Sequence, residues 1–220
     1  MACPASTSGR VLPVTRRWPF FDADIPIPPP PEPDPLQPGD EGIDVSHHQG
    51  VIDWPAVAGT GIRFAFIRAS YGDNIRDLHW GNNWQGAKAV GLRRGAYHYL
   101  TPWDDAGEQT DLFLSQLGAD FGELPPVLDV EEANLTAAML FIWLDRVYAV
   151  TRTLPLIYTS AGAWSAIGNP TGFSGYPLWV ASWRDGAPIL PAGWTDYSFW
   201  QYTDRGVVDG LNPCDRDRKH

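Results

Sequence analysis

From Gly39 to the C-terminus, short apolar runs alternate with stretches in which apolar residues recur at helical spacing. The short runs are rich in β-branched and aromatic residues and therefore predict strands. The stretches with helical spacing predict amphipathic helices, each with one face buried on a sheet. The predicted strands lie at 42–46, 62–69, 95–100, 127–131 and 154–159, and the predicted helices at 54–59, 83–90, 105–117 and 135–151.

Two further strands are predicted at 178–182 and 199–203, with only loops between them. Alternating strands and helices are typical of parallel βαβ units, and the helix-poor end indicates irregular closure. We therefore predict an α/β fold, an irregular TIM-like (β/α)5(β)3 barrel. Active sites of such barrels lie at the carboxyl ends of the strands. The polar residues predicted at those ends are Asp44, Arg68, Tyr99, Asp129, Glu131 and Tyr158.

Residues 1–38 differ in composition from the rest and are predicted to form a Pro-rich N-terminal arm, whereas residues 39–220 form the barrel domain. The run at 25–35 reads IPIPPPPEPDP, which favours an extended polyproline II conformation. Before it, residues 18–21 form the short aromatic segment WPFF. Two alternatives stay open for this arm: a flexible tail, or a docking segment that binds a partner or the domain's own surface.

The composition limits the classes of partner. A formal net charge of −10 argues against nucleic acid. The 11 Trp, 8 Tyr and 9 Phe favour a groove lined by aromatic rings, which commonly binds sugars, although a Trp-rich core is the alternative. No apolar run approaches the roughly 18 residues that a membrane span needs. The N-terminus has no apolar segment of the kind found in secretory signal peptides, so none is expected.

Metal and cofactor sites are not expected. His47 and His48 are adjacent in sequence, and adjacent residues of a strand point to opposite faces, so they would not easily bind one ion together with His98. The two cysteines, Cys3 and Cys214, lie near opposite ends of the chain without metal-binding spacing, and whether they form a disulfide stays open.

Two acids interrupt the apolar run at 127–131, namely Asp129 and Glu131. Residues two apart in a strand point to the same face, so both carboxylates should project side by side. The interaction between them should raise one pKa, which suits a proton donor beside a charged stabiliser. The structural alternative is a capping cluster for the next helix, with Asn134 capping Leu135 onward.

Taken together, the strand ends resemble the family 25 glycoside hydrolases, the Chalaropsis-type lysozymes, from about Gly42 to Asp217. The segments that carry the resemblance are Gly42–Gly50, Phe64–Ser70, Gly95–Tyr99, Leu128–Glu131, Pro177–Ala181 and Trp200–Thr203. The family implies an irregular barrel of eight strands and five helices. It also implies hydrolysis of the β-1,4 bond between N-acetylmuramic acid and N-acetylglucosamine in bacterial peptidoglycan.

The resemblance implies a role for each pocket acid. Glu131 would protonate the leaving oxygen, and Asp129 would stabilise positive charge or orient the substrate acetamido group. Asp44 matches the first-strand acid of the family, and Asp215 matches an acid near its end, although Cys214 and Asp217 depart from the usual Val-Asp-x-Asn pattern. A protein nucleophile, an inverting mechanism and assistance by the acetamido group all stay open.

The remaining candidates would bind substrate. Aromatic side chains can stack on or frame sugar rings, while for each of them a core role is the alternative; these are Tyr97, Tyr99, Tyr158, Trp179, Trp183 and Trp200. Arg68 would pair with the pocket carboxylates or form an ordinary salt bridge.

Three functions are compatible with these residues: a muramidase, a catalytically weak glycan-binding or structural module on the same barrel, and a hydrolase of another N-acetylated glycan such as chitin. Intact Asp44, Asp129 and Glu131 favour an enzyme. The setting we expect is extracellular action on the bacterial cell wall, by a phage lysin released by a holin or by a virion-associated hydrolase. A phage structural protein is then the candidate partner of residues 1–38. A host-encoded enzyme exported by another route is the alternative that stays open.

Overall fold

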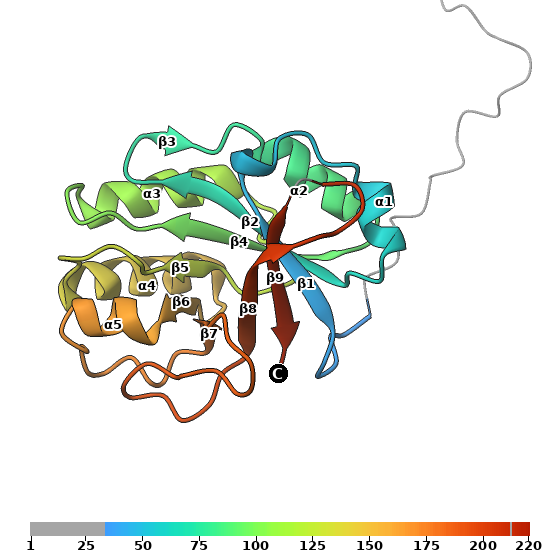
Figure 1. Cartoon of the computed structure of the whole chain (residues 1–220). Helices are drawn as coiled ribbons and strands as arrows, with labels where there is room; N and C mark the ends of the chain where they lie inside the picture. The colour runs from blue at the N-terminus through green and yellow to red at the C-terminus, as the bar shows by residue number, and fades with distance from the viewer. Residues whose placement is uncertain (1–33, 212) are drawn as a thin grey trace, which may run out of the picture. The chain divides into compact units, whose positions relative to one another are not determined.

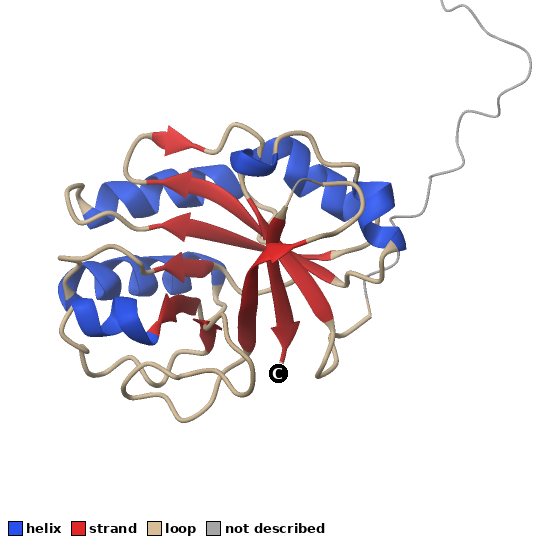
Figure 2. Ribbon diagram, viewed as in Figure 1, coloured by secondary structure: helices blue, strands red, loops and turns tan. Residues whose placement is uncertain are grey.

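The computed structural model describes residues 34–211 and 213–220. The aromatic segment at 18–21, most of the predicted arm and Cys3 lie outside the described residues. Within them, one sheet of nine strands is covered on one side by helices (Figures 1 and 2). The strands are β1 (Glu41–Val45), β2 (Phe64–Tyr71), β3 (Ile75–Arg76), β4 (Arg93–Tyr99), β5 (Val127–Asp129), β6 (Leu156–Ser160), β7 (Leu178–Ala181), β8 (Phe199–Gly206) and β9 (Cys214–Lys219).

Eight of these strands close into a barrel. The sheet order is β1-β9-β8-β7-β6-β5-β4-β2-β3, and a further parallel pairing of β1 with β2 completes the ring. The short β3 pairs only with β2 and stays outside the ring. All pairs within the ring are parallel except those of β9, which runs antiparallel to both β1 and β8. The predicted irregular α/β barrel is confirmed.

Four of the five α-helices in the described residues begin after a short polar side chain that accepts a backbone N–H group, and α2 does not. Asp53, Asp105, Thr136 and Ser160 act as such caps. The helices are α1 (Trp54–Gly59), α2 (Trp80–Ala89), α3 (Ala106–Leu117), α4 (Ala137–Thr151) and α5 (Ala161–Ala166), with a single 3₁₀ turn, η1 (His47–Gln49).

Three helix predictions are corrected. The helix expected at 83–90 begins at Trp80, because Trp80 and Trp84 stack one turn apart and both are buried. The helix expected from Leu135 begins two residues later with Thr136 as its cap, while Asn134 has a left-handed backbone conformation at φ 68°. The short α5 lies in a segment where the pattern placed no helix.

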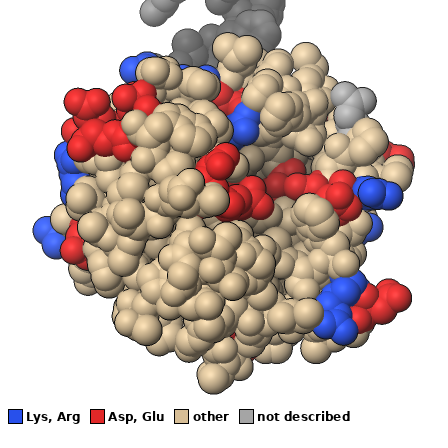
Figure 3. All heavy atoms as spheres, turned by 60° about the vertical axis from the view of Figure 1, so that its left-hand side comes forward, with Lys and Arg blue, Asp and Glu red and all other residues tan. Residues whose placement is uncertain are grey.

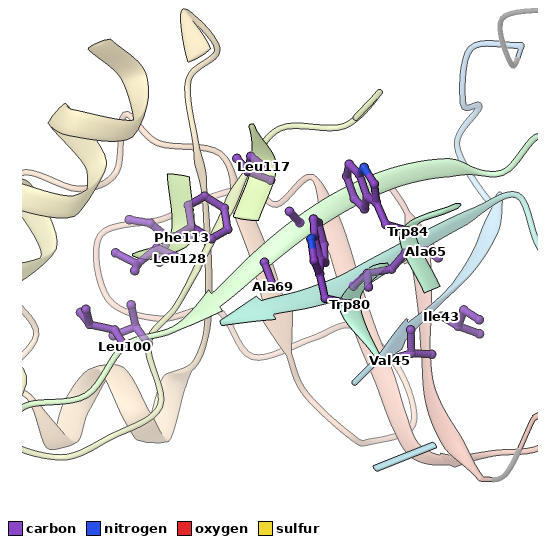
Figure 4. Close-up of a cluster of buried hydrophobic side chains, with 14 of the residues drawn as sticks. Ile43, Val45, Ala65, Ala69, Trp80, Trp84, Leu100, Phe113, Leu117 and Leu128 are labelled. Atoms are coloured by element: carbon purple, nitrogen blue, oxygen red, sulfur yellow. The ribbon is translucent and has the colours of Figure 1, made fainter. Parts of the chain in front are cut away.

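Strand alternation separates two cores. In β2, Phe64 and Phe66 point into the barrel, whereas Ala65 and Ile67 point outward to the helices. The interior core contains mainly rings, and Gly42 leaves the space that the Phe64 ring occupies, since a Cβ there would lie 2.2 Å from the ring. The outer core is mixed aliphatic and aromatic, and Figure 4 shows part of it between the strands and helices α2 and α3.

Candidate active site

A pocket opens at the end of the barrel where the parallel strands finish. It is lined by Asp44 from β1, Arg68 from β2, Tyr97 and Tyr99 from β4, Asp129 from β5, Tyr158 from β6, Trp179 from β7 and Asp215 from β9, together with Glu131 and residues Val45, Ser46, His48 and Gln49. Figure 3 shows acidic side chains gathered around a hollow on this side of the molecule. Nine of the eleven candidate residues predicted from the sequence therefore line one pocket.

Asp129 and Glu131 lie in this pocket as a pair. The strand β5 ends at Asp129 rather than at Glu131, but the alternation continues, with Val130 in the outer core. Neither acid caps α4, because Thr136 does. The sequence-based alternative of a capping cluster is thus excluded.

The environment of the pair favours protonated carboxyl groups. Burial first, and then the charge of Glu131, raise the pKa of Asp129 well above its usual range, while Arg68 opposes them. Glu131 stands at the exposed mouth, but the pocket walls still limit its hydration. This desolvation and the charge of Asp215 raise the pKa of Glu131, and the nearby Tyr158 hydroxyl opposes them. Since the interaction of two close carboxylates is mutual, the pair titrates as a unit.

Gln201 organises the opposite side of the pocket. Its Nε2 donates to Asp44 Oδ2 at 2.8 Å and to Asp215 Oδ2 at 3.2 Å. Its Oε1 accepts from the Tyr158 hydroxyl and from Trp183 Nε1, each at 2.9 Å. Sequence reasoning did not include Gln201 among the site residues. The signal was present, because alternation in the strand at 199–203 places it on the face opposite to Trp200.

Asp217 is a second residue that the site prediction missed. It is fully buried beneath the pocket, and its Oδ1 accepts from Trp179 Nε1 at 2.8 Å. The antiparallel course of β9 explains its place: Asp215 pairs with Asp44, and Asp217 lies one inward-facing position deeper, opposite Gly42 and Gln201.

Arg68 both lines the pocket and forms a salt bridge, the two roles considered for it in the sequence analysis. It lines the pocket, and its Nε also donates to Asp77 Oδ2 at 3.0 Å. Asp77 is buried and accepts from the backbone N–H groups of His47 and His79, each at 2.9 Å. Burial raises the pKa of Asp77, but these bonds outweigh it and lower the pKa. Asp77 therefore fixes Arg68 as a permanent positive charge in the pocket wall.

Trp183 and Trp200 do not line the acidic pocket. They line a neighbouring groove with Tyr202 and Arg218. Trp183 is 56% exposed and reaches the pocket only through its hydrogen bond to Gln201. Trp200 donates to the Ser182 carbonyl at 2.9 Å. The structure thus places Trp183 at the rim and Trp200 away from the pocket.

The histidines occupy different environments. His47 and His48 lie in the turn η1 rather than on a strand, with ring centroids 4.0 Å apart, so the strand argument against a shared ion is wrong in its premise. His98 is buried between Ser70 and Gln109, and burial lowers its pKa to about 4. Among the described residues, no three His, Cys, Asp or Glu side chains are arranged to hold a metal ion.

Comparison with known proteins identifies the enzyme family to which the chain belongs. Residues 43–211 match the family described as glycosyl hydrolases family 25. The chain belongs to this family, which confirms the resemblance seen in the sequence. None of the helices in the described part of the chain has the length and apolar character of a membrane span.

Individual relatives support the same family. The chain is 40% identical to YegX of Escherichia coli K12, a protein described as uncharacterized, over 78% of this chain. It is 37% identical to Lysozyme M1 of Streptomyces globisporus over 79% of this chain. The matched region spans about 65% of the length of each of these relatives. The crystal structure of a bacterial lysozyme from Streptomyces coelicolor superposes with a TM-score of 0.75 at 32% identity, covering 84% of this chain and 94% of that one.

Proposed function

We propose that the protein is a muramidase that hydrolyses the β-1,4 bond between N-acetylmuramic acid and N-acetylglucosamine in peptidoglycan. The observation that carries the proposal is the pair of Asp129 and Glu131 at the carboxyl end of β5, both with raised pKa values, in a barrel of family 25. The names of Lysozyme M1 and of the Streptomyces coelicolor lysozyme support the substrate class.

Glu131 is the proposed general acid. It stands at the mouth, where a glycosidic oxygen can reach it, and its raised pKa favours the protonated form that a general acid needs. Asp129 lies deeper and is the proposed negative charge that stabilises the oxocarbenium-like centre, because the charge of Arg68 opposes the rise of its pKa and favours its anion. Between the two macroscopic pKa values the pair holds one proton, and this is the form that the reaction uses.

The other pocket residues position the sugar. Asp44 and Asp215 form an acidic wall held by Gln201, and Asp215 also keeps the pKa of Glu131 high. Tyr97, Tyr99 and Trp179 supply aromatic walls, and Trp183 offers an exposed ring at the rim. The Tyr99 hydroxyl donates to Glu132 Oε1 at 2.9 Å, which holds its ring in place. Sugar rings pack favourably against such faces.

Product analysis separates the muramidase from its alternatives. Purified walls should lose turbidity, and the released fragments should carry N-acetylmuramic acid at their new reducing ends. Release of chitin oligomers without wall lysis would favour a hydrolase of another N-acetylated glycan. Retention of the chain on walls, with no new reducing ends, would favour a glycan-binding module. Asp145→Asn, on the helix α4 and outside the pocket, is a matched control for carboxylate replacement.

We further propose that the chain acts on the wall from outside the cell as a phage lysin or a virion-associated hydrolase, with residues 1–38 as a tether. The Pro-rich run at 25–35 and the aromatic segment at 18–21 support a spacer with a binding anchor. A chain that starts at Gly39 should then cleave soluble wall fragments at the full-length rate but fail to associate with phage particles. Loss of activity on truncation would assign the arm to the fold instead.

A further inference from the structure

A buried carboxyl group without a catalytic role lies directly beneath the pocket. Asp217 has no exposed surface, and its Oδ1 accepts a hydrogen bond from the indole of Trp179 at 2.8 Å. In the described part of the chain no N–H donor reaches its Oδ2, and the carboxyl group of Asp44 lies within hydrogen-bonding reach of Asp217. A buried carboxylate oxygen without a donor is costly. This oxygen therefore needs a proton that the surrounding N–H groups do not supply.

The donors around this group are few. Asp44, Asp215 and Asp217 form a cluster of three carboxyl groups, which receives two N–H groups from Gln201 and one from Trp179. Burial is nearly complete for Asp44, at 9% exposure, and complete for Asp217. Three donors satisfy at most three of the six oxygens.

Among residues 34–211 and 213–220, no positively charged side chain pairs with the cluster. On β9 and β1, Arg216 and Arg218 pair with Glu41, and on β2, Arg68 pairs with Asp77. Elsewhere the cluster faces Trp179 of β7, Gln201 of β8 and the phenol of Tyr158 on β6. Glu41 adds a further negative charge near Asp217. Three ionised carboxylates in such a place would repel one another at low effective dielectric constant.

We propose that Asp217 is a positioning residue that shares one proton with Asp44 and anchors the indole of Trp179 in the pocket wall. The shared proton satisfies Asp217 Oδ2 and leaves one negative charge on the two groups. Asp44 then keeps a fixed orientation toward Gln201, and Trp179 keeps its ring against the substrate space. Burial as the leading cause, followed by neighbouring carboxylates, raises the pKa of Asp44 well above normal, in agreement with a retained proton. Burial likewise raises the pKa of Asp217, despite the opposing bond from Trp179.

The direct test counts protonated carboxyl groups. Protein with ¹³C-labelled aspartate is measured by infrared spectroscopy at pH 7, in an Asp129→Asn background that removes the remaining buried aspartate with a raised pKa. We expect an isotope-shifted carboxylic acid band. That band should weaken in Asp217→Asn, because the amide N–H of the new side chain can donate to Asp44, which then ionises and no longer needs the shared proton. A background protein without any such band would overturn the proposal, whether or not the second variant folds. This measurement does not depend on the proposed muramidase activity.

The kinetic test rests on the proposed function and uses a pair of variants. Asp217→Ala removes the acceptor of Trp179 and the partner of Asp44, so KM should rise several-fold. Asp217→Asn restores both contacts and should return KM to within about twofold of wild type. The alkaline limb of its pH profile should also stay in place. In Asp217→Asn, Asp44 alone carries the one negative charge that the two groups share in wild type, so the total charge beneath the pocket is unchanged. A limb that moves to lower pH in Asp217→Asn would show that Asp217 is ionised and would overturn the proposal.

Discussion

Two groups of acidic side chains in this barrel lie in opposite electrostatic environments. At the start of β4, Asp120 and Glu123 surround the buried Arg94, with Arg94 Nη2 at 3.0 Å from Asp120 Oδ1 and 2.6 Å from Glu123 Oε1. Burial raises the pKa of both acids, but the bonds from Arg94 outweigh it and lower both values. In the pocket, no Arg or Lys of the described residues forms an ion pair with Asp129 or Glu131, and the pKa values of both acids rise.

The difference lies in charge compensation and not in residue type. A carboxylate bound by a guanidinium gains stability as an anion and has no proton to donate. A carboxyl group that loses hydration without gaining a cation retains a proton, which is the requirement for acid catalysis. We therefore assign the first group to the fold and, under the proposed function, the second group to catalysis. The predictions below would break or sharpen this distinction.

The largest effect is expected from Glu131→Gln. The amide keeps the shape of the side chain but has no transferable proton, so the rate of wall lysis should fall by roughly 10²–10⁴-fold. The free energy of unfolding should stay near that of wild type, as measured by urea denaturation. Near-normal lysis by this variant would remove Glu131 from the role of general acid.

Arg94→Met should lower the stability and leave the activity unchanged, which is the reverse of the effect expected for Glu131→Gln. Loss of the buried cation leaves Asp120 and Glu123 facing each other and removes the contact of Arg94 with the Trp84 ring at 4.3 Å. The free energy of unfolding should fall by about 3 kcal/mol, at the low end for a broken buried pair because both carboxylates are partly exposed.

The activity per folded Arg94→Met molecule should be unchanged. Arg205→Met is the matched control, since Arg205 is 88% exposed and should leave stability near wild type. If Arg94→Met abolished lysis without loss of stability, the assignment of this group to the fold would be wrong.

Asp129→Asn should lower turnover by at least about tenfold, because it removes the charge that faces the oxocarbenium-like centre. It should also move the alkaline limb of the activity profile to lower pH. The acid must stay protonated, so activity is lost as pH rises through its raised pKa, and loss of a neighbouring negative charge lowers that pKa.

Asp215→Asn should move the same limb in the same direction, because the charge of Asp215 raises the pKa of Glu131. Rates measured from pH 4 to pH 9 on soluble wall fragments give both limbs. If neither variant moved the alkaline limb, the carboxyl groups would not be coupled.

The smallest effect is expected from Glu123→Gln. Glu123 accepts from Arg94 and from its backbone N–H, and its pKa is lowered by these bonds despite burial. A lowered pKa contributes stability above the unfolded value near 4.3, and this contribution is lost as pH falls through the folded pKa. The free energy of unfolding of the variant should be about 1–2 kcal/mol lower than that of wild type at pH 7, and it should fall less steeply toward acid pH. An unchanged acid profile would show that Glu123 does not titrate with folding.

The sequence pattern predicted the parts of the site that depend on local periodicity. Alternation placed Phe64 and Phe66 inside and Ala65 and Ile67 outside, and the same period brought Asp129 and Glu131 to one face. Helix starts were predicted less well, because Asn134 and Thr136 are both plausible caps, and the packing of Leu135 into the core decides between them.

What the sequence by itself determined is the order of strands and helices from β1 to β8, apart from β3 and α5, and the acid pair at the end of β5, because neighbouring residues and a period of two fix them. Tertiary structure alone decided that β9 runs antiparallel and brings Asp215 and Asp217 beside Asp44, and that Gln201 of β8 reaches past β9 to Asp44. These contacts join residues more than 150 positions apart. Ring closure, and not local preference, sets their register, since the last strand must fill the gap between β1 and β8.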